Sequence, residues 1–234
     1  MKNKRVVIHQ PDFLPYLGFF HRLIHCDTLV FLDNAQFNRG GSRTCWHNRD
    51  KIKTTGGEKW LTVSVKKASL GTLINEIKLS DHTAWRKNNL NLIWENYKKA
   101  GFFKEIFPYI ETIYANDTDS LCQFNIKGLH ILMDLFDLRI ETKLASELNC
   151  RGKANDLVVD ILKQLGSDTY ISGVGAKDYF KPEPFEKAGI KIAWQKFTHP
   201  LYTQCHGKFI PFLSSIDLLF NCGIKHSRKI LQRI

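Results

Sequence analysis

The sequence predicts an α/β protein built in three layers around a mostly parallel sheet. Two short apolar runs, at residues 5–9 and 28–33, each end in polar residues, as buried parallel strands do. The segment between them has the length of a short helix, so these residues form a predicted strand–helix–strand unit with a right-handed crossover. The same alternation of strand and helix patterns returns in the second half of the chain.

The second half extends the predicted sheet. "RIETKLASEL", "TYISG" and "KIAWQKF" are typical of strands. Two helices are predicted between these strands: "DLVVDILKQL", with Asn155 as its cap and Gly166 at its end, and the shorter "PFEKAGI". "IPFLSSIDLLFNC" predicts a last helix, which ends at Gly223. The interpretation is a Rossmann-like sheet in one α/β domain over residues 1–234, since no repeat or Pro/Gly/Ser-rich linker divides the chain.

The residues between the two halves follow other patterns. "NRGGSRTCWHNRDKIKTTGGEK" has few apolar residues and predicts a loop or an irregular hairpin. "KWLTVSV" alternates like a strand, with "EIKL" as its expected partner. Ser80 is the predicted cap of a helix at about 81–100, and two further helices, the first with Pro108 at its start or at a kink, complete a helical insertion at about 81–137.

Composition limits the function classes. The net charge of +11 favours anionic partners: nucleic acid, a membrane surface or phosphorylated small molecules. No apolar run is long enough to span a bilayer, and the first one is too short for a secretory signal, so we expect a cytoplasmic protein. The six cysteines have no metal-ligand spacing, so we expect small buried side chains and no metal site.

Polar residues at the predicted strand ends are the first candidates for a site. His9 and Gln10 follow the first strand, and Gly18 opens the next helix, whose N-terminus would favour a bound anion. Asp33 and Gln36 follow the second strand and suit sugar or ribose hydroxyls, although a simple turn is an equal alternative.

Basic and glycine-rich segments supply the other candidates. The basic segment 39–53 suits phosphate binding, or else is a solvated loop. Gly173 and Gly175 form a G-x-G turn after a predicted strand, a weak signal for a diphosphate. His199 and His206 have imidazoles that titrate near neutral pH, and each is expected to orient a substrate more than to act as the base.

Four segments carry a family resemblance. The first half contains "VVIHQPDFLPYLGFFHRLIHCDTLVFLDNAQF" followed by "NRDKIKTTGGEKWLTVSVKK", and the second half contains "TYISGVGAKDYF" and "FEKAGIKIAWQKFTHPLYTQCHGKFIPFLSSIDLLFNCG". With these segments the sequence resembles the WbqC-like family over nearly the whole chain. The resemblance implies a bacterial enzyme of surface-polysaccharide biosynthesis (O-antigen or lipopolysaccharide type) that transfers an acyl or aminoacyl group to a nucleotide-linked amino sugar. The residues that match family-type positions are His9, Gln10, Pro15, Gly18, Asp33, Gln36, Asn48, Lys51, Lys59, Trp60, Gly173, His199, His206 and Asn221. Phe13 and Tyr16 stand where Tyr and Trp are commoner.

These observations give an expected site. The catalytic candidates are His9, His21 and Asp33. The substrate-binding candidates are Gln10, Tyr16, Gly18, Gln36, Arg43, Asn48, Lys51, Lys59, Gly173, Gly175, His199 and His206. The expected partners are a nucleotide-linked sugar and an acyl donor such as acyl-CoA or acyl carrier protein, with no nucleic acid, and the sequence leaves open whether the chain forms a homodimer.

Two other functions stay open at this point. One is a nucleotidyltransferase or adenylate-forming enzyme, because Gly18 and His21 resemble a modified H-x-G-H motif whose spacing is altered. The other is a basic RNA-binding module, which ranks last because no strand interleaves aromatic and basic residues.

Overall fold

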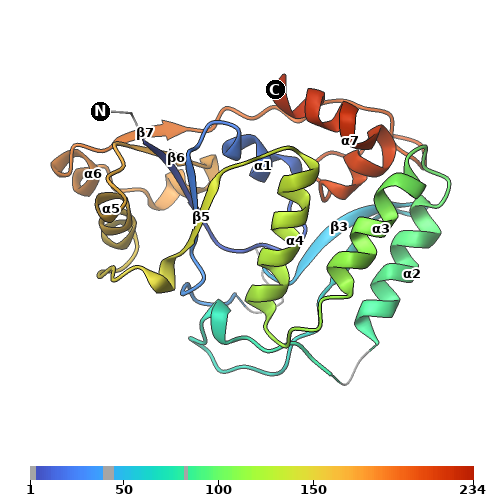
Figure 1. The fold of residues 1–234 in the computed structure, drawn as a ribbon, viewed down its shortest axis with the longest axis horizontal. Coiled ribbons are helices and arrows are strands. Elements are labelled where there is room, and N and C mark those ends of the chain that lie inside the picture. The colour runs from blue at the N-terminus through green and yellow to red at the C-terminus, as the bar shows by residue number, and fades with distance from the viewer. Residues whose placement is uncertain (1–3, 39–44, 82–83) are drawn as a thin grey trace.

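A computed structural model describes residues 4–38, 45–81 and 84–234 and contains a five-stranded parallel sheet (Figure 1). Its order is β5-β2-β1-β6-β7, and every neighbouring pair is parallel. The strands are β1 (Arg5–His9), β2 (Thr28–Phe31), β5 (Glu141–Leu144), β6 (Thr169–Ser172) and β7 (Lys191–Trp194). The predicted α/β class with a mostly parallel sheet is confirmed.

The strand order reverses direction between β1 and β6. From β1 the chain moves outward through β2 to β5, and then returns to the other side of β1 to form β6 and β7. The connections at the carboxyl ends of β1 and β6 therefore lead to opposite sides. In open parallel sheets the crevice at such a switch point is where ligands bind.

Helices cover both faces of the sheet. Because successive strand residues face opposite sides, Val6 and Ile8 pack in a cluster with α5 (Asn155–Gln164) and α6 (Glu183–Lys187), whereas Val7 belongs to the larger cluster on the other face. The larger cluster contains residues of α1 (Leu17–Leu23), α4 (Leu121–Leu135) and α7 (Ile216–Gln232). The predicted three layers are thus helix, sheet and helix (Figure 1).

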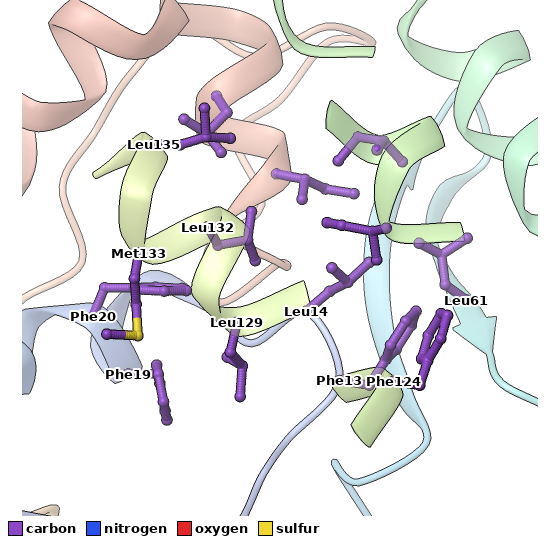
Figure 2. Packing of buried hydrophobic residues seen from close by; sticks show 14 of the residues in the cluster. Phe13, Leu14, Phe19, Phe20, Leu61, Phe124, Leu129, Leu132, Met133 and Leu135 are labelled. Carbon is purple, nitrogen blue, oxygen red and sulfur yellow. The ribbon is translucent and has the colours of Figure 1, made fainter. Parts of the chain in front are cut away.

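The predicted helical insertion contains α2 (Trp85–Tyr97), α3 (Phe103–Tyr114) and α4. It shares its apolar core with the segment that follows β1, since Phe13 stacks on Phe124 of α4 with ring centroids 6.2 Å apart (Figure 2). This packing holds one side of the loop after β1. Short 3-10 turns complete the chain at Ile74–Glu76, Ala145–Glu147 and Val174–Tyr179.

The segment before the insertion is an antiparallel hairpin of β3 (Arg49–Thr54) and β4 (Gly57–Thr62). The hairpin alternative for this basic segment is therefore correct. The expected pairing of "KWLTVSV" with "EIKL" is found only at the ends of the two segments: Leu79 bridges antiparallel to Val65, and the N–H of Lys66 donates to the Lys78 carbonyl at 2.8 Å, but residues 76–79 form no regular strand. The sequence misleads because β3 buries Asp50 and Lys53, so its polar residues do not mark a solvent-exposed loop.

Two predicted helix starts differ from the structure. The first insertion helix starts at Trp85, and Ala154, not Asn155, precedes α5, because the Asn155 side chain donates instead to the Tyr179 carbonyl. The predicted helix end at Gly223 coincides with a break: Gly223 has the non-helical angles φ 70° and ψ 168°, and a second helical piece of α7 continues beyond this kink to Gln232. Among the described residues, no helix combines the length and apolarity needed to cross a membrane.

Candidate functional site

A cavity of about 720 Å³ opens at the carboxyl ends of β1 and β6, at the switch point of the sheet. Its walls come from the end of β1 and the loop after it, the inner side of α1, the end of β6 with its glycine turn, and single residues of β3 and the segment after β7. This is the position where the topology predicts ligand binding.

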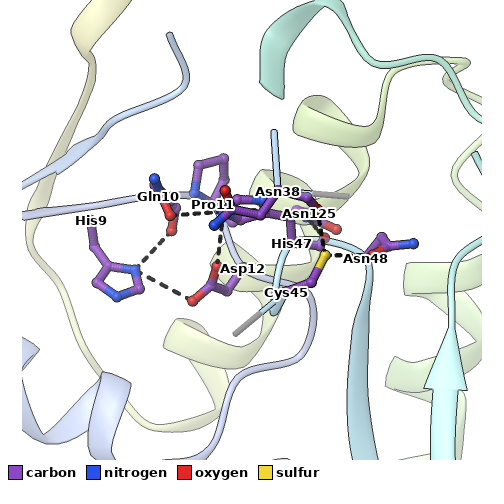
Figure 3. Close-up of polar contacts among 9 residues, drawn as sticks. All are labelled: His9, Gln10, Pro11, Asp12, Asn38, Cys45, His47, Asn48 and Asn125. Carbon is purple, nitrogen blue, oxygen red and sulfur yellow. Dashed lines mark hydrogen bonds and ion pairs between the residues drawn. The ribbon is translucent and has the colours of Figure 1, made fainter. Parts of the chain in front are cut away.

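The loop after β1 is held in one conformation from several sides. Pro11 and Pro15 restrict it, and Leu14 between them has a positive φ of 42°. The buried side chain of Asn125, on α4, donates from Nδ2 to the carbonyls of Pro11 at 2.7 Å and His47 at 2.6 Å (Figure 3). These contacts fix the residues that the loop presents to the cavity.

His9 lies at the end of β1 and faces the cavity. Its Nδ1 is 2.8 Å from the carbonyl oxygen of Gln10, and because a carbonyl only accepts, Nδ1 carries the hydrogen and Nε2 is unprotonated (Figure 3). Burial, with the nearby Arg22 charge, lowers the pKa of His9 to about 3. At neutral pH this imidazole is a neutral hydrogen-bond acceptor.

Asp12 lies between two imidazoles in the same cavity wall. Its carboxylate oxygens are 3.7 Å from Nδ1 of His9 and 4.0 Å from Nε2 of His47 (Figure 3). Burial raises the pKa of Asp12 to about 7, against the opposing effect of Arg22. A carboxyl that titrates near neutral pH suits general acid–base chemistry.

Gln10 and His47 complete this polar wall. Nε2 of His47 lies 2.7 Å from Oε1 of Gln10, so the imidazole donates and fixes the Gln10 side chain (Figure 3). Burial lowers the pKa of His47 to about 4, so this ring is also neutral. Asp50, on β3, also lines the cavity, and burial raises its pKa well above the ordinary value.

Aromatic and apolar side chains surround the mouth of the cavity. Tyr16 lies over Gly18, where a Cβ would be only 2.3 Å from the tyrosine ring, so glycine is required for this position of the ring. Tyr179 and Phe212 also line the cavity but are 70% and 56% exposed. Exposed aromatic faces beside a polar cavity suit a planar group such as a nucleobase.

The structure brings part of the sequence-predicted site together. His9, Gln10, Tyr16, Gly173 and Gly175 line the cavity, and Gly18 lies beneath Tyr16.

His21 and Asp33, the other catalytic candidates, lie outside the cavity. Nε2 of His21 is 2.9 Å from the Ile234 carbonyl, and its Nδ1 accepts from Gln195 at 3.0 Å; this histidine lines a second hollow of about 380 Å³. Asp33 is buried and accepts from the backbone N–H of Ser146 at 2.9 Å, which ties the end of β2 to the end of β5. Neither side chain therefore lies beside His9 in the cavity lining.

The remaining binding candidates also lie outside the cavity lining. Asn48 donates to the Val63 carbonyl, Lys51 pairs with Glu58, and Lys59 and Gln36 are exposed. His199 and His206 contact the carbonyls of Pro200 and Asn96. Arg43 lies outside the described residues.

Sequence reasoning missed several cavity residues: Asp12, Arg22, Asp50 and Gln195. It also missed His47, which does not line the cavity but holds the Gln10 side chain. Asp12 lies within the motif that drew attention to His9, so its position beside the two prolines was an available signal. Arg22 gave none, because a cation in a short amphipathic helix is normally on the solvent side.

Within the described ranges, no group of three or more histidine, cysteine, aspartate or glutamate side chains is arranged to hold a metal ion. No cysteine lines the cavity, and none of the six forms a disulfide.

The fold and the cavity define a doubly wound α/β protein with a polar cavity at the switch point of its sheet. A family model described as the WbqC-like protein family matches residues 10–229, and the chain belongs to this family. It is similar to the uncharacterized protein Rv1507c of Mycobacterium tuberculosis (strain ATCC 25618 / H37Rv), with 30% identity over 226 residues that cover 94% of each chain. No solved structure matches the chain.

Proposed function

We propose that this protein is a transferase of bacterial surface-polysaccharide biosynthesis, which moves an acyl or aminoacyl group onto the amino group of a nucleotide-linked sugar. The observation that carries the proposal is the pairing, in one cavity wall, of the neutral His9 acceptor with the Asp12 carboxyl that titrates near pH 7. Family membership supports the biosynthetic setting.

In this proposal His9 orients the sugar amine and Asp12 takes its proton. The amine donates a hydrogen bond to the unprotonated Nε2 of His9, which directs the nitrogen lone pair toward the acyl carbon of the donor. A C–N bond forms as the bond between the acyl carbon and its leaving group, the thiolate of a thioester donor, breaks. The amine proton passes to Asp12 and then to the leaving thiolate. A carboxyl group with a pKa near neutrality can both accept and return a proton at neutral pH.

The rest of the cavity suits the rest of this substrate. Gln10 is held by His47 and offers its amide to sugar hydroxyls. Tyr179 and Phe212, exposed at the mouth, offer stacking faces for the base. A nucleotidyltransferase reaction has less support, because His21, the histidine of the H-x-G-H-like motif, lines the second hollow and not the cavity.

The direct test is a mass-spectrometric assay of the full chain with acetyl-CoA and a panel of nucleotide-linked amino sugars. We expect an N-acyl product from free amines and none from sugars that are already N-acetylated. Asp12→Asn should lower turnover about 100-fold or more, the usual contribution of a general base. Asp119→Asn, an exposed carboxylate paired with Lys78, is the matched control and should retain turnover. Diphosphate release from a nucleoside triphosphate, without any N-acyl product, would support the nucleotidyltransferase instead.

A further inference from the structure

Arg22 is a buried cation without a counter-ion among the described residues. It lies in the last turn of α1, is only 7% exposed, and lines the cavity. No carboxylate of the described chain lies within 4.0 Å of its guanidinium, and its buried Nε has no hydrogen-bond partner. The guanidinium carbon lies 5.8 Å from the centre of the Phe19 ring, and the Asp12 carboxyl acts on Arg22 only from beyond 4.0 Å, so neither makes a close ion pair with it.

The other fully buried cation, Lys53, shows how this fold satisfies a structural charge. Its ammonium donates to Oε1 of Gln204 at 3.1 Å and to the carbonyls of Gly207 at 3.2 Å and Lys208 at 2.5 Å. Taking a charge out of water is costly unless such partners replace the water. Arg22 lacks such partners among the residues that the structure describes, so its partner is expected to come from solution.

The surroundings of Arg22 offer hydrogen-bond donors to such a partner. Ser172, at the end of β6, is 1% exposed and lines the same cavity; its hydroxyl lies near the Tyr170 side chain but makes no hydrogen bond of good geometry among the described residues. Gly173 follows it, and a Cβ at this position would lie 3.4 Å from Nη1 of Arg22, so the glycine keeps the approach to the guanidinium open. An arginine fork beside a hydroxyl matches an oxyanion.

We propose that Arg22 and Ser172 form a phosphoryl-binding subsite on the cavity wall between β1 and β6. A phosphoryl group is favoured over a carboxylate because this is the switch point of a parallel sheet, beside a G-x-G turn, where such folds bind phosphates. The assignment of this group to the diphosphate of a nucleotide-linked sugar rests on the proposed function.

If Arg22 binds a phosphoryl group, one substitution should raise the melting temperature of the free protein and weaken its binding of diphosphate. Arg22→Met keeps much of the side-chain length and removes the charge. Without ligand, this variant should melt at a higher temperature than the wild type, because an uncompensated buried charge is removed. Calorimetric titration with inorganic diphosphate should show affinity about 10- to 100-fold weaker, which corresponds to the loss of a charged hydrogen-bonding group. Ser172→Ala should weaken diphosphate binding about 3- to 10-fold, as expected for a neutral hydrogen bond.

Arg139→Met is the matched control, because it removes the same charge from a side chain that is 71% exposed and paired with Asp134. It should bind diphosphate like the wild type. Wild-type affinity in Arg22→Met, or a lower melting temperature of that variant without ligand, would overturn the proposal by making Arg22 a structural residue. Stabilisation of the wild type by succinate but not by diphosphate would also overturn it in favour of a carboxylate site. Because diphosphate binding needs no acyl donor, failure of the transferase assay leaves this test independent.

Discussion

The imidazole of His9 and the carboxyl group of Asp12 lie side by side in the cavity wall, with 3.7 Å between Nδ1 and Oδ2 (Figure 3). At neutral pH they are not a full ion pair, because burial lowers the pKa of His9 to about 3 and raises that of Asp12 to about 7. The carboxyl group is the member of the pair that changes charge in the physiological range. This relationship makes Asp12 the proton acceptor and His9 the orienting residue in the proposed reaction.

Asp12→Asn should change how stability depends on pH. The folded-state pKa of about 7 lies above the ordinary value of 3.8, so between these values the folded chain binds a proton that the unfolded chain releases. The Asp12 contribution to stability is therefore lost as the pH rises from about 4 to about 7. Compared with the wild type, Asp12→Asn should gain melting temperature across this range. A temperature difference that stays constant from pH 4 to pH 8 would contradict the raised pKa of Asp12.

His9 should remain neutral in mildly acidic solution. Since burial lowers its pKa to about 3, the ring should keep its hydrogen on Nδ1 at pH 5 and show no protonation there. Nitrogen-15 NMR of the imidazoles, with His9→Gln to assign the signal, measures this directly. A midpoint near the ordinary value of 6.5 would mean that His9 is solvated and not held by the cavity wall.

Asn125→Ala should destabilise the loop after β1. The Asn125 amide donates to two buried carbonyls, of Pro11 and His47, and its removal leaves both without that donor. The expected loss is about 2–4 kcal/mol in the free energy of unfolding, measured by urea denaturation. Asn96→Ala is the matched control, because its amide bonds only a carbonyl of its own helix, and it should cost less than about 1 kcal/mol. Equal costs for the two variants would argue against the bridging role of Asn125.

Gly223→Ala should be destabilising, by about 1–3 kcal/mol or more. Gly223 has a positive φ of 70°, and a Cβ would lie 2.4 Å from the ring of Phe102, so both the backbone and the packing require glycine. Gly101→Ala is the comparison, since a Cβ there meets no atom within 4 Å. If denaturant midpoints show that the two variants are equally stable, the kink in α7 does not depend on glycine.

The sheet was predictable because its strands carry simple local signals. β1, β2, β6 and β7 are short apolar runs that end in polar residues, and their helices follow ordinary periodicity. β3 was predicted only as part of a loop or an irregular hairpin, because its residue Lys53 is buried through long-range partners, the carbonyls of Gly207 and Lys208. A local pattern cannot show partners that are distant in sequence.

The candidate site was predictable only where it coincides with strand ends. His9 and Gln10 follow directly from the end of β1, and Gly173 from the end of β6. Asp33 also ends a strand, but Ser146 and the turn after β5 bury it, which depends on the neighbouring strand. Arg22 reaches the cavity from the inner side of α1, and no spacing in the sequence distinguishes it from a solvated cation.

The most direct test of the central claim is a crystal structure of the Asp12→Asn variant with a nucleotide-linked amino sugar. We predict density in the cavity between β1 and β6, with the sugar nitrogen within hydrogen-bond distance of Nε2 of His9 and the diphosphate on Arg22. Ordered ligand bound elsewhere, with the His9 cavity filled only by water, would contradict the assignment of this cavity as the active site.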